Sequence, residues 1–148
     1  MTQEDKVLKD LLLKDLCGRL PYGVKVQTTY INPQTKERKD IGTDVLSTVE
    51  ISMLIDGYYE PKPYIFPLSS MTEVQLKEMQ EIIGNPNEVC ISVNTLGLEL
   101  WLNPVGTDPT IWLDSVFEIQ DWLNAHHFDY RGLIPKGLAI DATGKNIY

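Results

Sequence analysis

The stretch YGVKVQTTYI, residues 22–31, decides the fold that this sequence predicts. Four of its residues alternate with their neighbours: Val24, Val26, Thr28 and Tyr30. Because successive side chains of a strand point to opposite faces of a sheet, this alternation predicts a strand with those four residues on one face. The segments before and after it carry the signals of the other elements.

A helix is predicted before this strand. Thr2 can cap it, and Glu4 and Asp5 in its first turn complement the helix dipole. Gly18 and Pro21 are predicted to end it. Apolar residues recur along it at helical spacing: Val7, Leu8, Leu11, Leu12 and Leu16. The pattern is that of an ordinary amphipathic helix.

Another strand is predicted after the loop of residues 32–42. The segment TDVLSTVEISMLI, residues 43–55, is rich in β-branched residues, which favour strands. Four of its residues share one face of the predicted strand: Val49, Ile51, Met53 and Ile55. Asp56 and Gly57 follow, a pair that suits a tight hairpin turn because both central positions of that turn need a positive φ.

The predicted return strand, YYEPKPYIF at residues 58–66, contains Pro61 and Pro63. Proline has no N–H to donate to a sheet, so this strand is expected at a sheet edge or to be irregular. Four aromatic residues lie on or beside it: Tyr58, Tyr59, Tyr64 and Phe66. They form either an edge that binds a partner or a part of the core.

The second half predicts two more helices around two short strands. Residues 69–84 read as a helix, because Ser70 with Glu73 and Thr72 with Gln75 both fit a capping box. Residues 88–93 and 96–102 read as strands, and a further helix is predicted near Ser115. Residues 1–148 are therefore expected to form a single compact α+β domain, with a largely antiparallel sheet of about five to six strands and about three helices packed mainly on one face.

Composition narrows the function. The chain of 148 residues has 13 basic and 21 acidic residues, a net charge of −8, which disfavours nonspecific binding to nucleic acids and to anionic membranes. The basic cluster at residues 36–39 is interrupted by Glu37 and reads as a solvated hairpin tip. Cys17 and Cys90 form no C-x-x-C motif, and neither a signal peptide nor a membrane-spanning run is evident. We expect an acidic cytosolic protein with reduced cysteines, no membrane association and no cofactor.

The most distinctive stretch is WLNAHHFDYRGLI, residues 122–134. Its binding candidates are His126, His127, Asp129, Tyr130 and Arg131. His126 continues the apolar stripe of the predicted helix, whereas His127 lies about 100° further round. Because a helical zinc pair needs a spacing of three or four residues, no metal site is expected. The structural interpretation places His126 partly buried at the helix end, Asp129 as the cap of the next turn, and the Tyr130 hydroxyl outward.

Several chemical alternatives remain open for this stretch. One histidine with Asp129 and a remote carboxylate could hold a metal ion. Cys17 or Cys90 could act as a nucleophile with a histidine as base. Arg131 and the histidines, with aromatic faces, could hold an anionic nucleotide-type ligand. No G-x-S-x-G elbow and no phosphate-binding glycine loop is present.

Three segments carry a resemblance to known proteins: KDLCGRLPYGVKV at residues 14–26, KPYIFPLSSMTEVQ at 62–75 and DWLNAHHFDYRGLIPKGLAIDA at 121–142. They resemble a group of small uncharacterised proteins encoded by phages, prophages and mobile regions of gut bacteria. The resemblance spans most of the chain and supplies neither an activity nor catalytic residues. Pro135 departs from the group and argues against a continuous helix over residues 130–136, so we expect one helical turn followed by extended chain.

These observations together predict a phage-type accessory protein, not an enzyme, that binds a host or phage protein. Its acidic character suits a basic partner. A nucleotide-type small-molecule binding protein is the first alternative, and a weak hydrolase that uses Cys90 and a histidine is the second.

Overall fold

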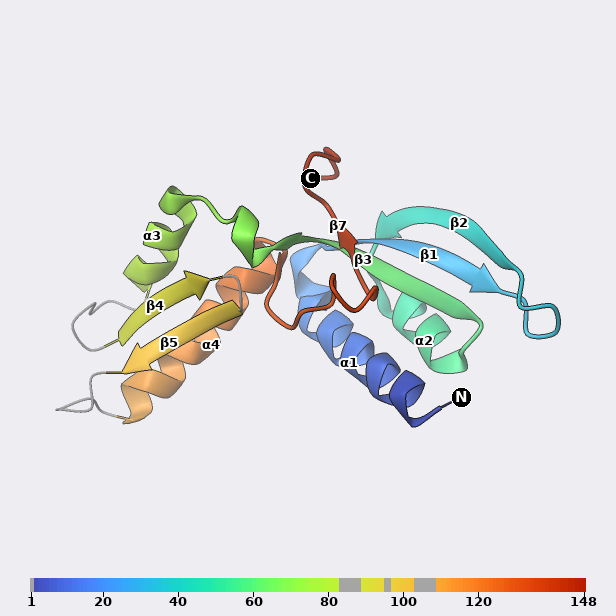
Figure 1. The fold of residues 1–148 in the computed structure, drawn as a ribbon, viewed down its shortest axis with the longest axis horizontal. Helices are drawn as coiled ribbons and strands as arrows, with labels where there is room; N and C mark the ends of the chain where they lie inside the picture. The colour runs from blue at the N-terminus through green and yellow to red at the C-terminus, as the bar shows by residue number, and fades with distance from the viewer. Residues whose placement is uncertain (1, 83–88, 95–96, 103–108) are drawn as a thin grey trace. The chain divides into compact units, whose positions relative to one another are not determined.

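The computed structural model describes residues 2–82, 89–94, 97–102 and 109–148 (Figure 1). The chain divides into two compact units: unit 1 comprises Met1–Ile65 and Arg131–Tyr148, and unit 2 comprises Phe66–Tyr130. The described residues form four α-helices, a mixed sheet of five strands and a separate two-stranded sheet. The predicted α+β class is confirmed, with four helices where the sequence predicted three. The single-domain organisation stays a prediction.

The strand predicted within residues 22–31 is an inner strand of the sheet in unit 1. This strand, β1 (Lys25–Ile31), pairs antiparallel with β2 (Arg38–Val45) on one side and with β3 (Tyr59–Pro67) on the other. Strand β2 lies at the edge of the sheet, and all eight of its residues are exposed. The β1–β2 connection is a hairpin, as the basic cluster predicted, but its second strand begins at Arg38 rather than after residue 42.

The first helix, α1 (Gln3–Arg19), begins where the sequence predicted. Thr2 and Asp5 form a capping box, in which the Asp5 N–H donates to the Thr2 hydroxyl at 3.1 Å. The hydrogen bond from the Thr2 side chain, followed by that from its backbone, lowers the pKa of the Asp5 carboxyl. The helix continues through Gly18, so the predicted stop at that residue is wrong. A 3-10 turn, Leu20–Tyr22, then leads into β1.

Residues 48–56 are a helix, α2 (Thr48–Asp56), and the predicted strand over residues 43–55 is wrong. Ser47 and Glu50 form a capping box, which satisfies N–H groups that a strand would pair with a neighbour. Ile51 and Leu54, three residues apart, turn one face of α2 to the core. Gly57, with φ of 87°, ends the helix instead of forming a hairpin turn.

The two prolines of β3 occupy positions that need no N–H on the β1 side. The Ile31 N–H donates to the Tyr58 carbonyl at 2.8 Å, and hydrogen-bonded pairs recur at every second residue of an antiparallel ladder. Glu60 and Lys62 therefore face β1, whereas the ring nitrogens of Pro61 and Pro63 face away from it. The predicted edge position holds for residues 59–63, which pair only with β1 within the described residues. It is wrong for residues 64–67, which pair with further strands.

Unit 1 has its own hydrophobic core. Helices α1 and α2 lie on one face of the β1–β2–β3 sheet (Figure 1). Truncation of a buried leucine in such a core costs about 2–5 kcal/mol, so these residues hold the unit together. The buried members are Leu12, Leu16, Val24, Val26, Leu46, Leu54, Ile65, Leu133 and Ala139.

The chain returns to unit 1 after residue 130 as turns and one short strand. Residues 133–137 form turns, and β7 (Ile140–Asp141) then pairs parallel with Tyr64 and Ile65 of β3. There is no continuous helix over residues 130–136, in agreement with the effect expected of Pro135.

Unit 2 contains the elements of the second half. Thr72 and Gln75 cap α3 (Glu73–Ile82), while the Ser70 hydroxyl donates to the Pro67 carbonyl in the preceding 3-10 turn, Leu68–Ser70. The predicted strand pair is confirmed as β4 (Val89–Asn94) and β5 (Gly97–Leu102). Helix α4 (Pro109–Ala125) begins earlier than the predicted start at Ser115, and the side chain of Ser115 lies outside the described part.

The core of unit 2 gathers around the end of α4. Strand β6 (Phe128–Asp129) pairs parallel with the last two residues of β3, Phe66 and Pro67. The buried residues are Leu68, Met79, Ile119, Trp122, Leu123 and Phe128. Within the described residues, every helix falls short of the length and apolarity that a membrane crossing requires.

Candidate functional site

His126 lies at the C-terminal end of α4, stacked on the side chain of Trp122. The ring centroids are 4.0 Å apart, and the imidazole Nδ1 is 2.9 Å from the Trp122 carbonyl oxygen. The His126 N–H donates to the same carbonyl at 3.0 Å. His126 is partly buried, as its place on the apolar stripe predicted. Its ring therefore helps to complete the helix end.

His127 has a different role from its neighbour. Its φ is 61°, in the left-handed region that few residues other than glycine adopt, and this conformation turns the chain out of α4. The His127 N–H donates to the Asn124 carbonyl at 3.2 Å, and the His127 carbonyl accepts from the Phe66 N–H at 2.8 Å. The double histidine thus marks the passage from α4 to β6.

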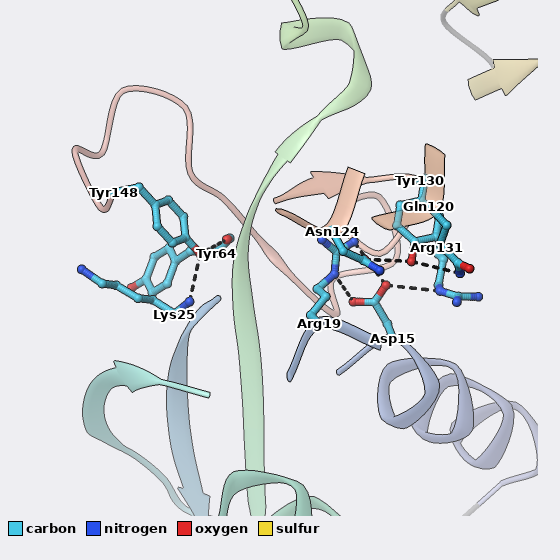
Figure 2. Close-up of polar contacts among 9 residues, drawn as sticks. All are labelled: Asp15, Arg19, Lys25, Tyr64, Gln120, Asn124, Tyr130, Arg131 and Tyr148. Carbon is cyan, nitrogen blue, oxygen red and sulfur yellow. Dashed lines mark hydrogen bonds and ion pairs between the residues drawn. The ribbon is translucent and has the colours of Figure 1, made fainter. Parts of the chain in front are cut away.

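Asp129 and Tyr130 follow His127 and lie at the end of unit 2. Asp129 is buried in β6 opposite Pro67, and its predicted role as the cap of the next turn stays a prediction. The Tyr130 hydroxyl was expected to point outward, but it donates to Asn124 Oδ1 at 2.9 Å and accepts from Gln120 Nε2 at 3.4 Å (Figure 2). The physical reason is that a buried amide on α4 needs a donor, and the phenol supplies one.

Arg131 belongs to unit 1 and lies beside a buried ion pair of α1. Arg19 Nε donates to Asp15 Oδ2 at 2.7 Å, and the side chains of both residues are 0% exposed. Arg131 Nε lies 3.3 Å from Asp15 Oδ1, with 19% of its side chain exposed (Figure 2). One carboxylate thus stands between two guanidinium groups. The boundary between the units falls between Tyr130 and Arg131, so the five candidates of the HHFDYR segment divide between the two units.

The sequence left three chemical alternatives open: a metal site, a cysteine nucleophile and a nucleotide-type ligand. No group of three or more His, Cys, Asp or Glu side chains there could hold a metal ion. Cys17 is exposed on α1 with a free thiol, and the side chain of Cys90 lies outside the described part. Arg131 pairs with Asp15 and His126 stacks on Trp122, and the nucleotide-type ligand stays a prediction.

The four aromatic residues proposed as a partner edge do not form an exposed row. Tyr64 is buried, the Tyr59 ring lies 5.4 Å from that of Tyr30, and Phe66 lies 6.4 Å from Phe128. Tyr58 alone of the four is strongly exposed. Burial removes the Tyr64 ring from a partner edge, whereas Tyr59 and Phe66 are half-buried and their part in such an edge stays a prediction.

Charge divides unequally between the two units. Unit 2 has ten acidic residues and one basic residue, Lys77, a net charge of −9. Unit 1 has eleven acidic and twelve basic residues, a net charge of +1. The whole excess of negative charge therefore lies in unit 2, and the average over the chain conceals it.

The last turns of α4 present part of this charge beside an exposed aromatic ring. Phe117 is 60% exposed, and Glu118, Asp121 and Ala125 are exposed with it. At 100° per residue these four positions fall within one 100° sector, which we call the α4 stripe. Ile119, Trp122 and Leu123 on the other side of the helix are buried. The stripe is therefore not needed to form the core of unit 2.

Helix α3 has a similar exposed face. Its exposed positions are Glu73, Val74, Lys77, Glu78 and Glu81, and Val74 is 76% exposed. Trp122 Nε1 of α4 donates to Glu78 Oε1 of α3 at 3.4 Å, which ties the two helices together. Within the described side chains, both helices of unit 2 thus place carboxylates in solvent beside a large apolar side chain, Val74 on α3 and Phe117 on α4.

No family model, curated protein or solved structure matches this chain.

Sequence reasoning missed the α4 stripe and the buried ion pair, although signals for both are present. Asp15 and Arg19 stand four residues apart, the spacing of a helical ion pair. A charge count beyond residue 65 would have found the acidic half. The boundaries of unit 2 could not have been read from the sequence, because β3 crosses one of them without a break.

Proposed function

We propose that this protein is a non-enzymatic accessory protein that binds a basic protein partner through the acidic helices of unit 2, with the α4 stripe as the principal contact. The observation that carries the proposal is the concentration of net charge, −9 in unit 2 against +1 in unit 1. A field of one sign attracts a cationic surface at long range and orients it before contact.

The apolar residues within the acidic faces support docking in addition to attraction. Phe117 stands in the α4 stripe beside Glu118 and Asp121, and Val74 stands among the glutamates of α3. Protein interfaces commonly bury an aromatic anchor at the centre and keep charged groups at the rim, where they set the on-rate and the choice of partner. The expected partner surface therefore carries lysines or arginines around an apolar hollow.

The resemblance to phage- and prophage-encoded proteins supports a host or phage protein as the partner, met in the bacterial cytosol. Nucleic acids are unsuitable partners for unit 2, because ten carboxylates repel a phosphate backbone.

A titration of the ¹⁵N-labelled protein with a defined peptide tests the proposal. The probe is a helical peptide with lysines and arginines around two leucines, and its control has the same leucines but glutamates in place of the basic residues. The expected result is chemical-shift change at residues 116–125 with the basic peptide and none with the control. Shift changes confined to α1 or β2, or no change at millimolar peptide, would overturn the proposal.

A further inference from the structure

We propose that residues 142–148 form a releasable strap, pinned to unit 1 by the Tyr148 hydroxyl, which occupies the place of a backbone hydrogen bond between β1 and β3. This inference concerns a conformational device in unit 1 and does not depend on the α4 stripe.

The pattern of the β1–β3 ladder identifies the place that the hydroxyl takes. Paired residues run from Val26 with Pro63 to Tyr30 with Tyr59. The hydrogen bond from Ile31 to Tyr58 makes every second pair a hydrogen-bonded one, in the direction of Lys25 and Tyr64. The regular ladder would therefore continue with a direct bond from the Lys25 N–H to the Tyr64 carbonyl.

Tyr148 stands between those two groups instead. Its hydroxyl accepts from the Lys25 N–H at 2.9 Å and donates to the Tyr64 carbonyl oxygen at 2.7 Å (Figure 2). One phenol thus satisfies a donor on β1 and an acceptor on β3, as an inserted water molecule would. The contact joins residues that are 123 and 84 positions apart in the sequence.

Further contacts hold the strap near both of its ends, and the Thr143 and Lys145 N–H groups between them donate to the nearby Asp141 side chain and Ala142 carbonyl. At one end the Ala142 N–H donates to the Ile65 carbonyl at 2.9 Å. At the other, Lys25 Nζ donates to the Ile147 carbonyl at 2.8 Å and lies 5.9 Å from the Tyr148 ring centroid. Residues 143–146 between them are exposed. A segment held in this way can detach at one end without unfolding the core.

Release of the strap costs little, because it leaves neither the Lys25 N–H nor the Tyr64 carbonyl without a partner. When the hydroxyl departs, the Lys25 N–H and the Tyr64 carbonyl face each other and can bond directly, which avoids the usual cost of an unsatisfied buried group. Tyr148 is also 46% exposed in the attached strap, so its release brings little additional apolar surface into water. Burial raises the pKa of the Tyr148 phenol, so the hydroxyl keeps its donating proton to a higher pH than an unperturbed tyrosine does.

Backbone ¹⁵N relaxation of wild-type protein and the Tyr148→Phe variant tests the strap. Phenylalanine keeps the ring and removes the hydroxyl that pins it. Tyr58→Phe is the matched control, because Tyr58 is exposed and outside the strap. The expected result is a fall of the heteronuclear NOE at residues 143–148 in Tyr148→Phe alone, with β1, β3 and α1 unchanged.

Three results would overturn the proposal of a releasable strap. The first is an NOE at residues 143–148 that stays equal to that of wild type, which would show that the hydroxyl does not pin the segment. The second is a loss of order through β1 and β3 as well. The third is a Tyr148→Phe variant that does not fold. Either of the last two would make Tyr148 part of the core and not a releasable pin.

Discussion

Asp15 and Arg19 form an ion pair at 2.7 Å on one turn of α1, and neither side chain reaches solvent. Arg131 approaches the other carboxylate oxygen of Asp15 at 3.3 Å. Removing charged groups from water is costly, and the cost is recovered only when every charge keeps its partner. The stability of unit 1 therefore depends strongly on the single carboxylate of Asp15.

Replacement of Asp15 by asparagine keeps the shape of the side chain and removes its charge. We expect the free energy of unfolding to fall by about 3–5 kcal/mol, because the buried Arg19 guanidinium then loses its ion pair with Asp15. Urea denaturation followed by circular dichroism measures the change. Asp10→Asn on the exposed side of α1 is the control, and it should stay within about 0.5 kcal/mol of wild type.

Replacement of both members of the pair should be less harmful than removal of the carboxylate alone. In Asp15→Leu/Arg19→Met the buried charges leave together, and apolar replacements of buried pairs are often neutral. We expect the double variant to be more stable than Asp15→Asn in the same urea denaturation. A double variant less stable than the single one would show that other contacts of these side chains dominate.

The free energy of unfolding at alkaline pH should depend on Tyr148. Burial raises the pKa of its phenol above the usual value of 10.0, partly offset by the hydrogen bond from the Lys25 N–H and by the charge of Arg19. A raised folded-state pKa means that the contribution of the hydroxyl is fully present below pH 10.0 and is lost as the pH rises through the folded pKa.

The measurement is the difference in free energy of unfolding between wild type and Tyr148→Phe from pH 7 to pH 11.5. We expect about 0.5–1.5 kcal/mol at pH 7, the usual net worth of a hydrogen-bonded hydroxyl, and a decline only at pH values above 10.0. Tyrosines present in both proteins cancel in this difference. A difference that vanishes by pH 9 would contradict the raised pKa.

The stability of helix α2 should depend on its capping box. The Ser47 hydroxyl accepts from the Val49 N–H at 3.2 Å, and Glu50 accepts from the Ser47 N–H at 2.8 Å. Ser47→Ala should therefore lower the free energy of unfolding by about 0.5–2 kcal/mol. Thermal denaturation checks this, with exposed Ser69→Ala as the control. Equal midpoints for the two variants would argue that residues 48–56 gain nothing from this cap.

The α2 segment shows why part of the fold escaped sequence reasoning. Val49, Ile51, Met53 and Ile55 alternate as in a strand, whereas Ile51 and Leu54 have helical spacing. Short apolar runs fit both periods, and the ends then decide between them. The Ser47–Glu50 capping signal was present but was outweighed by the β-branched composition. By contrast, the Thr2 and Thr72 caps lay beside unambiguous helical patterns and were predicted correctly.

Side-chain contacts likewise include local ones that the sequence predicted and long-range ones that it could not. The partial burial of His126 followed from local spacing, because His126 continues the stripe that Ile119 and Leu123 form on α4. The hydroxyl bridge of Tyr148 could not be predicted, since nothing in the local sequence indicates that a tyrosine will meet Lys25 and Tyr64. Contacts between residues so far apart in the sequence are determined by the fold of the whole unit.

The dissociation constant of the basic helical peptide, measured for two charge-reversal variants, tests the proposed function most directly. Glu118→Lys/Asp121→Lys changes the α4 stripe, and Asp10→Lys/Asp56→Lys makes the same change of charge at exposed positions of unit 1. We predict that the first variant weakens binding about tenfold, equivalent to about 1.4 kcal/mol, and that the second leaves it within about twofold. Equal weakening by both variants would mean that net charge alone attracts the peptide, and would contradict a binding site on α4.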